Sequence, residues 1–336
     1  MLPRAYIGKL CPGYSHNPIL NPNLGRIRKE SRIFMERAFD VLKEPVFDLV
    51  DDVTSADFIM LPHDYFVIEK ERDYVDQYVR LAKEHKKKLL IFDFSDFDRA
   101  IDISIATIFR VSQYRSSKRS NVIMMPAFAE DLGTHNSVII RQKSNKPTIG
   151  FVGWATFNDS TQWLKYFAKN LLLHGPRRQG VYFRRRAIAI LSSDKRIKTN
   201  FITRSSFSGH RDTISLNPEI ARQEYIDNIS NSDFVLAPKG DGNYSIRFYE
   251  ALSLGHIPIL IDTETVLPLE DVIDYDKFIL RIPWQEIDSI PERVIEFYAN
   301  LNNEQFVEMQ EKAQGAFEQY LRFDKFIKYA LDELIL

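Results

Sequence analysis

The fold is decided by one stretch, residues 232–261, which reads SDFVLAPKGDGNYSIRFYEALSLGHIPILI. The apolar residues before Pro238 predict a buried strand, and a loop with two glycines follows it. Ser245 suits the N-cap of a helix that ends near Gly255. The apolar run 257–261 predicts the next strand. This order of strand, glycine loop, helix and strand is typical of a parallel sheet in an α/β fold.

The same alternation continues outward through the rest of the chain. A helix is predicted over 74–88, and a second, long helix is predicted to begin at Asn302, with Gln305 completing its cap. The remaining predicted strands are 58–62, 89–94, 122–126, 148–153 and 197–202.

A polar break at 141–147 indicates a linker between domains. We therefore expect Rossmann-like domains over 1–145 and 146–300. Residues 301–336 are predicted to form a helical segment that packs back toward the first domain.

Composition excludes several classes of protein. The 336 residues include 45 Lys and Arg against 46 Asp and Glu, which argues against a globally basic nucleic-acid binder. The single cysteine, Cys11, excludes an intramolecular disulfide framework. No apolar run approaches 18 residues, and the first residues do not resemble a signal peptide. The sequence predicts a cytoplasmic protein without a membrane span, and peripheral contact with a membrane surface stays open.

The helix after the glycine loop predicts an anion site. A helix N-terminus at the carboxyl edge of a parallel sheet presents free backbone N–H groups, and it disfavours a cation such as Arg247 unless an anion is bound. Glu250, three residues on, could accept hydrogen bonds from ribose hydroxyls. A nucleoside diphosphate derivative fits both features. The alternative is an ordinary helix with an Arg–Glu surface pair.

The stretch also resembles the donor-site signature of the exostosin-like glycosyltransferases, glycosyltransferase family 47. The residues that match are Ser232, Phe234, Leu236, Pro238, Gly240, Ser245, Arg247, Glu250, Leu252, Gly255, Pro258 and Ile259. The form GNYSIRFYE, over 242–250, is most similar to the bacterial or viral branch. The resemblance implies a GT-B architecture, with two Rossmann-like domains facing across a cleft. The first domain would bind the acceptor and the second the nucleotide sugar, with no cofactor required.

Donor-binding residues follow from this resemblance and from a basic segment, 174–211. The segment holds ten Lys or Arg residues and one acidic residue. It is interpreted as a polyanion site for the donor pyrophosphate, for an anionic glycan or for a phospholipid-linked acceptor. A solvated helix face is the simpler alternative. The predicted donor-binding residues are Gly240, Gly242, Asn243, Ser245, Arg247, Glu250, Arg204 and Arg185.

The catalytic base is expected on the first domain, because inverting transfer needs a group that removes the proton of the acceptor hydroxyl. His63 and Asp64 end a predicted strand, and relatives often carry a similar His-Asp pair there. The alternative is a loop hydrogen-bond pair. Three further carboxylates, Asp93, Asp96 and Asp98, have a spacing that fits a cation, but we interpret them as loop and helix caps, with no metal site.

The sequence therefore predicts a glycosyltransferase that moves a sugar from a UDP- or GDP-sugar to a glycan or glycolipid hydroxyl with inversion. Two other classes stay open. One is an inactive sugar-nucleotide or glycan-binding protein on the same scaffold. The other is a nucleic-acid-binding protein that uses the segment 174–211, although no aromatic-interleaved RNA module is evident and no nucleic-acid partner is expected.

Overall fold

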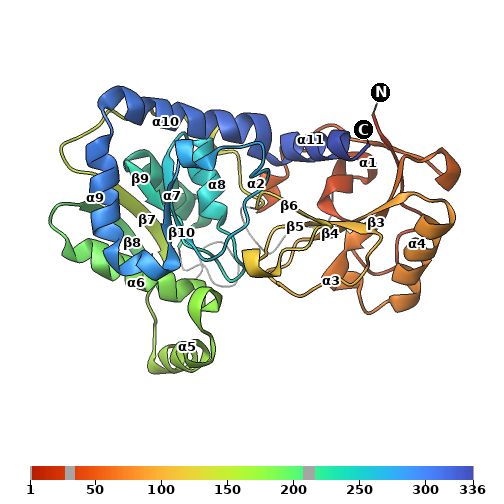
Figure 1. Ribbon diagram of the computed structural model, residues 1–336, viewed down its shortest axis with the longest axis horizontal. Helices are drawn as coiled ribbons and strands as arrows, with labels where there is room; N and C mark the ends of the chain where they lie inside the picture. The colour runs from red at the N-terminus through yellow and green to blue at the C-terminus, as the bar shows by residue number, and fades with distance from the viewer. Residues whose placement is uncertain (1, 27–34, 207–215, 336) are drawn as a thin grey trace.

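The computed structural model describes residues 2–26, 35–206 and 216–335. Figure 1 shows two sheets set side by side, each with helices packed against it. All strand pairs within both sheets are parallel. This confirms the prediction of an α/β fold with two Rossmann-like domains of the GT-B type.

The first sheet has the order β2-β1-β3-β4-β5-β6. Its strands are β1 (Arg4–Tyr6), β2 (Asp48–Leu49), β3 (Phe58–Asp64), β4 (Lys88–Asp93), β5 (Ala106–Arg110) and β6 (Val122–Met124). The helices of this half are α1 (Asn21–Leu24), α2 (Met35–Ala38), α3 (Tyr65–Ile68) and α4 (Arg72–Glu84). Strands β3 and β4 are buried along almost their whole length, as expected for strands covered on both faces.

The second sheet has the order β11-β10-β9-β7-β8. Its strands are β7 (Thr148–Trp154), β8 (Lys198–Arg204), β9 (Phe234–Leu236), β10 (Ile257–Asp262) and β11 (Leu280–Pro283). The helices are α5 (Ser160–Leu172), α6 (Gly180–Ser193), α7 (Pro218–Ser230), α8 (Ile246–Ser253), α9 (Ile290–Asn300) and α10 (Asn303–Ala316). Both sheets reverse their strand order beside their first strand, and that reversal is where open α/β sheets bind ligands.

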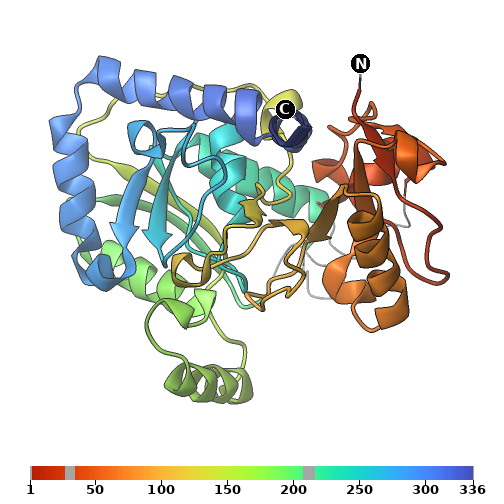
Figure 2. The same ribbon diagram turned by 45° about the vertical axis from the view of Figure 1, so that its right-hand side comes forward.

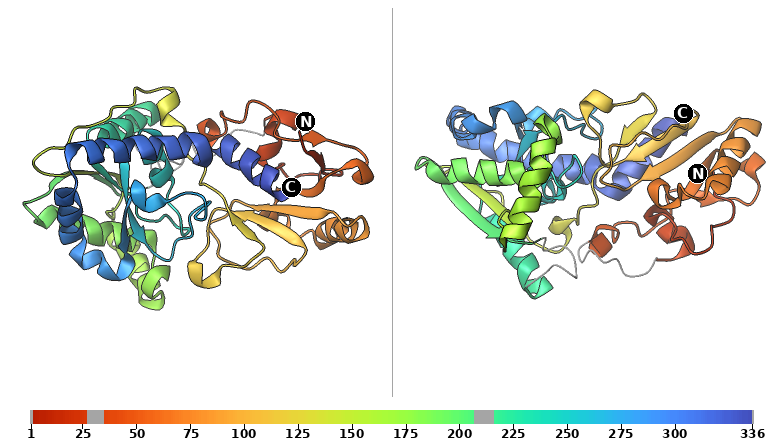
Figure 3. Two further views of the ribbon diagram at one scale, coloured as in Figure 1. Left: turned by 45° about the horizontal axis from the view of Figure 1, so that its top comes forward. Right: turned by 90° about the horizontal axis from the view of Figure 1, so that it is seen from below.

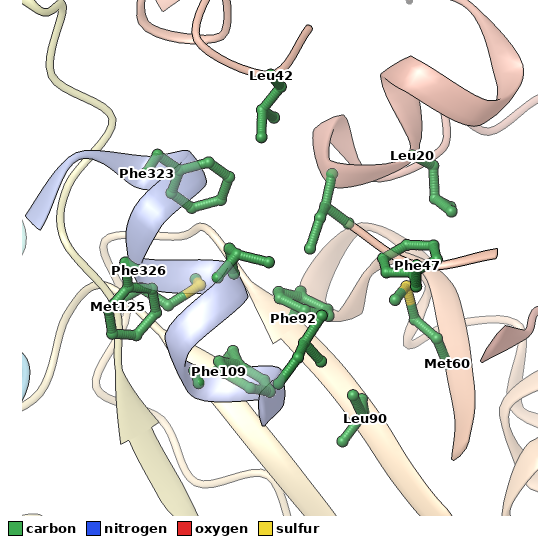
Figure 4. Close-up of a cluster of buried hydrophobic side chains, with 14 of the residues drawn as sticks. Leu20, Leu42, Phe47, Met60, Leu90, Phe92, Phe109, Met125, Phe323 and Phe326 are labelled. Carbon is green, nitrogen blue, oxygen red and sulfur yellow. The ribbon is translucent and has the colours of Figure 1, made fainter. Parts of the chain in front are cut away.

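The end of the chain links the two halves. Helix α10 begins with the predicted capping box, in which Asn302 and Gln305 exchange hydrogen bonds. A π-helical turn, Phe317–Leu321, leads into α11 (Phe323–Ile335). Phe323 and Phe326 of α11 lie in the hydrophobic core of the first domain, beside Phe92 and Phe109 (Figure 4). The left panel of Figure 3 shows α10 and α11 running from the second half to the first.

The carboxyl edges of the two sheets face each other. The backbone N–H of Asn243, in the glycine loop, donates to Ser112 Oγ just after β5 at 2.9 Å. A further bridge joins Tyr114 to Thr265, which follows β10. Figure 2 shows the loops that follow the strands of both sheets meeting between the two halves. Any site built from both edges therefore draws residues from both domains.

Candidate functional site

Arg247 occupies the point where the second sheet reverses its strand order. Its side chain crosses from α8 to β7, where Nη2 donates to Val152 O at 2.6 Å. The guanidinium lies over the ring of Phe151, with its carbon 4.4 Å from the ring centroid. No ion pair joins Arg247 to Glu250, so the simple alternative of a surface Arg–Glu pair is wrong. Arg247 is thus a half-buried cation on backbone oxygen and an aromatic face.

Two more cations lie at this edge, and neither is among the donor-binding residues that the sequence predicts. Arg184 of α6 donates to Trp154 O at 3.3 Å and to Lys239 O at 3.1 Å. Lys239 is 3% exposed, and its ammonium donates to the Tyr114 hydroxyl at 2.7 Å and to Pro176 O at 2.8 Å. We call Arg184, Lys239 and Arg247 the cation cluster.

Within the described residues, no carboxylate forms an ion pair with any member of the cation cluster. Burial lowers the pKa of Arg184 to about 10, and the charge of Arg247 lowers it further. Burial likewise lowers the pKa of Lys239 to about 7, with the charge of Arg177 acting in the same direction. The Nε–H groups of Arg184 and Arg247 are buried without a hydrogen-bond partner. Burying a cation and leaving a buried N–H unpaired both lower the stability of the fold, and a bound anion would offset both effects.

The glycine loop is only partly open to a ligand. The Gly240 N–H donates to Tyr244 O within the loop at 2.7 Å. Gly242 faces the first domain, where an added Cβ would lie 2.8 Å from Asp96 Oδ1 and 3.0 Å from Ser112 Oγ. Gly242 therefore allows the two domains to approach closely, which is a packing role the sequence did not reveal.

Asn243 also acts between the domains. It is 1% exposed, and its amide donates to Gln113 O and Thr263 O, each at 3.1 Å. Its side-chain oxygen accepts from the Thr263 hydroxyl at 2.6 Å. The prediction that Asn243 contacts the nucleotide sugar is corrected, because its side chain is buried and joins Gln113 of the first domain to Thr263 of the second.

Ser245 stands at the N-cap of α8, as predicted, but its side chain makes no capping hydrogen bond. The first N–H groups of this eight-residue helix therefore keep no side-chain cap. Glu250 is 5% exposed, and its two oxygens accept from Arg222 and from the Tyr225 hydroxyl, each at 2.7 Å. Arg222 also pairs with Glu130, so Glu250 belongs to a buried ion network as well.

The basic segment 174–211 is dispersed rather than gathered into one patch. Four of its arginines pair with carboxylates: Arg177 with Asp98, Arg186 with Asp288, Arg196 with Asp194, and Arg204 with Glu224. Arg185 donates to Ala155 O at 3.0 Å and lies over Phe157. Arg211 lies outside the described residues. Arg204 ends β8 at the predicted edge, but Glu224 neutralises its charge there.

On the first domain, His63 is excluded as the base. Its ring has no exposed surface, Nε2 accepts from the Cys11 N–H at 3.0 Å, and Nδ1 lies 2.8 Å from Ser15 O. Burial lowers the pKa of His63. The register of β3 is irregular between Met60 and Asp64, so the different surroundings of His63 and Asp64 are set by tertiary contacts and not by sequence order.

Asp64 keeps the chemistry that a base requires. Oδ2 accepts from the Phe94 N–H at 2.7 Å, and Oδ1 caps α3 by accepting from Phe66 and Val67. Burial raises the pKa of this carboxyl to about 6, and the charge of Asp93 adds to the effect. The pKa lies close to neutral pH, where general bases work best.

The neighbouring carboxylates Asp93 and Asp98 have separate structural partners. Asp93 is fully buried and pairs with Arg110 at 2.7 Å, while it also accepts from Ser95. Asp98 accepts from the Ser117 hydroxyl and from Arg177. Among the residues that the structure describes, no group of three or more His, Cys, Asp or Glu side chains could hold a metal ion.

The chain has two parallel α/β domains whose carboxyl edges face each other, and the cation cluster lies at the edge of the second. This arrangement defines a GT-B type protein. The model of the Exostosin GT47 domain matches residues 102–296, which is more than half of the chain. The chain therefore belongs to the exostosin GT47 family. The match begins in the first domain and ends within α9.

Individual relatives match shorter stretches. An exostosin-1 homolog of Caenorhabditis elegans is 31% identical over 106 residues, which covers 32% of this chain and 27% of that protein. A probable glycosyltransferase of Arabidopsis thaliana is 33% identical over 67 residues, or 20% of this chain and 14% of that one. The chain thus spans about a quarter, or less, of the length of these curated relatives. They are animal and plant proteins, so the bacterial or viral branch stays a prediction.

Solved structures resemble the chain over nearly its whole length. The lipopolysaccharide outer core galactosyltransferase WaaB has a TM-score of 0.44 at 14% identity, covering 99% of this chain and 100% of that one. HepE of Anabaena, solved in complex with UDP-glucose, has a TM-score of 0.36 at 10% identity, covering 99% and 98%. Because both scores are below 0.5, the fold assignment rests on the strand orders of the two sheets.

Among the helices that the structure describes, none combines the length and the apolarity needed to cross a bilayer.

Proposed function

We propose that this chain is a glycosyltransferase that moves a sugar from a nucleoside diphosphate sugar to a hydroxyl of a glycan acceptor, with inversion. The observation that carries the proposal is the cation cluster. Arg184 and Arg247 act on each other where the second sheet reverses its strand order, and Lys239 follows β9 on the same edge. None of the three forms an ion pair with a carboxylate in the described chain. A diphosphate supplies the missing negative charge and accepts from the unpaired Nε–H groups.

The chemistry then divides between the two edges. Asp64 takes the proton of the acceptor hydroxyl, and the oxygen attacks the anomeric carbon from the side opposite the diphosphate. The bond to the diphosphate breaks, and its growing charge is stabilised by the cation cluster and by the uncapped N-terminus of α8. Ser245 and Glu250 would contact the phosphates and the ribose. Glu250 has acceptor positions left for that contact beside Arg222 and Tyr225.

The acceptor site would lie on the loops after β3 and β4. Phe97 is 55% exposed there, and its ring packs against Phe66 at 5.4 Å between centroids. Arg99 lies over the Phe66 ring. The loop that carries Phe97 also supplies the Phe94 N–H to Asp64. An exposed aromatic face beside the base suits the apolar face of a sugar ring.

A thermal-shift panel tests the donor site. The full chain is heated with UDP, GDP, ADP, CMP and their common sugars, each with magnesium or with EDTA. We expect a concentration-dependent rise in Tm for one nucleotide, because a ligand that binds only the folded state stabilises it.

Arg247→Ala should remove that rise, while Arg186→Ala, a surface arginine paired with Asp288, should keep it. Equal shifts in both variants would contradict the donor-site assignment. A nucleotide response without transfer to any acceptor would favour the inactive binding protein.

A further inference from the structure

Helix α5 turns its apolar side chains outward. Five large hydrophobic residues of this 13-residue helix are exposed, and it has no buried residue. They are Trp163 (48% exposed), Leu164 (60%), Phe167 (51%), Leu171 (66%) and Leu172 (80%). Trp163 and Phe167, one turn apart, stack with their centroids 5.4 Å apart. These five residues are the α5 apolar face.

The side of α5 that faces the domain is polar or aromatic. Gln162 accepts from the Asn158 N–H, Tyr166 packs on Phe157, and Asn170 bonds with Gln179. These three positions are spaced by four, so they form one stripe of the helix. A surface helix of a soluble protein normally has the reverse arrangement, with its apolar stripe against the core. The apolar face of α5 is therefore available to a partner outside the domain.

The position of α5 relates it to the candidate site. It follows β7 directly, so it is inserted at the carboxyl edge of the second sheet, where the cation cluster lies. Figures 1 and 2 both show α5 projecting away from the two sheets, at the tip of the lower loop. A flat partner could meet this helix without contacting the rest of the domain.

The surroundings of α5 are positively charged. Residues 160–193 contain no Asp or Glu. Within α5, Lys165 and Lys169 stand one turn apart, beside the apolar face and both exposed. Arg178 follows the helix after a short turn, beside Arg177, whose charge Asp98 neutralises. Exposed tryptophan, phenylalanine and leucine flanked by lysines are typical of helices that lie in the surface of an anionic membrane.

We propose that α5 docks on an anionic lipid bilayer, with the α5 apolar face in the headgroup region and Lys165 and Lys169 on the lipid phosphates. A second copy of the chain is a poorer partner, because a twofold contact through α5 would bring the four lysines of two helices together. The inference goes beyond the proposed function and does not need it. If both hold, the bilayer presents lipid-linked acceptors at the edge of the donor site.

Vesicle binding tests the inference. The full chain is sedimented with vesicles of pure phosphatidylcholine or of phosphatidylcholine mixed with phosphatidylglycerol. We expect binding to the mixed vesicles that weakens at high salt. The fluorescence of Trp163 should shift to the blue on binding, and Trp163→Phe should remove the shift while Trp154 and Trp284 remain.

Two variants separate the apolar and the charged contributions. Phe167→Glu with Leu171→Glu should weaken vesicle binding at least about tenfold, because burying even one such side chain contributes that much. Lys165→Gln with Lys169→Gln should weaken binding about fivefold for each lysine removed. Ile220→Glu is the matched control, since it places a charge on another exposed apolar position, 65% exposed on α7, and should bind as the parent does.

Three outcomes would overturn the inference. The first is no sedimentation with either vesicle. The second is equal binding by the Phe167→Glu, Leu171→Glu variant. The third is a concentration-dependent dimer in light scattering, abolished by that same variant, together with no vesicle binding. Nucleotide thermal shifts should be unchanged in all α5 variants, so failure here is distinguishable from failure of the donor site.

Discussion

The carboxyl edges of the two sheets present different titratable groups, although both sheets reverse their strand order in the same way. The first edge presents Asp64, whose hydrogen bonds within the described residues come from backbone N–H groups. The second presents Arg184, Lys239 and Arg247, which rest mostly on backbone carbonyls. The same topology thus presents different side chains at the two edges, and this difference is the basis for proposing that Asp64 removes the proton and that the cation cluster binds the diphosphate.

The largest expected effect is the loss of turnover when Asp64, on the first edge, is replaced. Asp64→Asn should lower turnover by about 10² to 10⁴ while nucleotide affinity is kept, because only proton removal is lost. Steady-state transfer and thermal shifts, measured on the same preparation, check this. Asp102→Asn, at an exposed carboxylate paired with Arg119, is the matched control. Turnover that survives in Asp64→Asn would remove the base from this edge.

The dependence of turnover on pH is a second test of Asp64 as the base. The pKa of Asp64 is raised to about 6, and a base acts only when it is deprotonated. Turnover should therefore fall as pH drops through this value and stay level above it. A profile that is flat across this range would show that another group accepts the proton.

On the second edge, Arg247→Ala should weaken nucleotide binding by about 10- to 150-fold, which is the range for a hydrogen bond to a charged group. Calorimetric titration with the nucleotide found in the thermal-shift panel measures it. If Asp64→Asn weakened nucleotide binding by the same factor, the proposal that the first edge removes the proton and the second binds the nucleotide would be wrong.

We expect Lys239 to have a smaller effect on nucleotide affinity, one that depends on pH. Its pKa is lowered to about 7, so the free protein loses this positive charge above neutral pH, while a bound diphosphate favours the charged form. Affinity for a nucleotide sugar, whose diphosphate does not titrate there, should fall with rising pH by up to about tenfold per unit. Lys239→Met should bind more weakly at low pH, with a flat profile. A parent affinity that is independent of pH would contradict the role of Lys239.

The smallest expected effect on nucleotide affinity comes from a substitution at the contact between the two edges. Ser112→Ala removes the hydroxyl that accepts from the buried Asn243 N–H and leaves this donor unpaired, so it should lower the free energy of unfolding by about 1–3 kcal/mol. Denaturant unfolding measures this. Nucleotide affinity should change less than in Arg247→Ala, because Ser112 contacts the loop and not the cation cluster. A larger loss of affinity would mean that the interdomain contact itself shapes the donor site.

Much of the fold could be predicted from local patterns. The glycine-loop unit appears as β9, α8 and β10, and the cap at Asn302 begins α10. Strands β1, β2, β5 and β11 were not predicted. The first two are only two or three residues long, and such short segments carry little periodicity. The linker signal at 141–147 was visible because polar residues interrupt the alternation.

The candidate site was predictable only where one helix holds it. Ser245 and Arg247 follow from the cap position and the first turn of α8. Lys239 and Arg184 were missed as donor residues, although Lys239 stands inside the quoted stretch and Arg184 in the basic segment. Nothing local distinguishes a buried cation from a solvated one. His63 and Asn243 failed for the same reason, because their partners Cys11 and Gln113 are far away in sequence.

Local patterns in the sequence were enough to establish the α/β class, the strand–loop–helix unit, the family and the position of Arg247. These depend on periodicity, caps and spacing, which act within a few residues. The pairing of the charges, the raised pKa of Asp64 and the outward apolar face of α5 became evident only from the packing of the folded chain. Pairing and burial are set by contacts between segments distant in sequence, and the free energy of a charge depends on those contacts rather than on its neighbours along the chain.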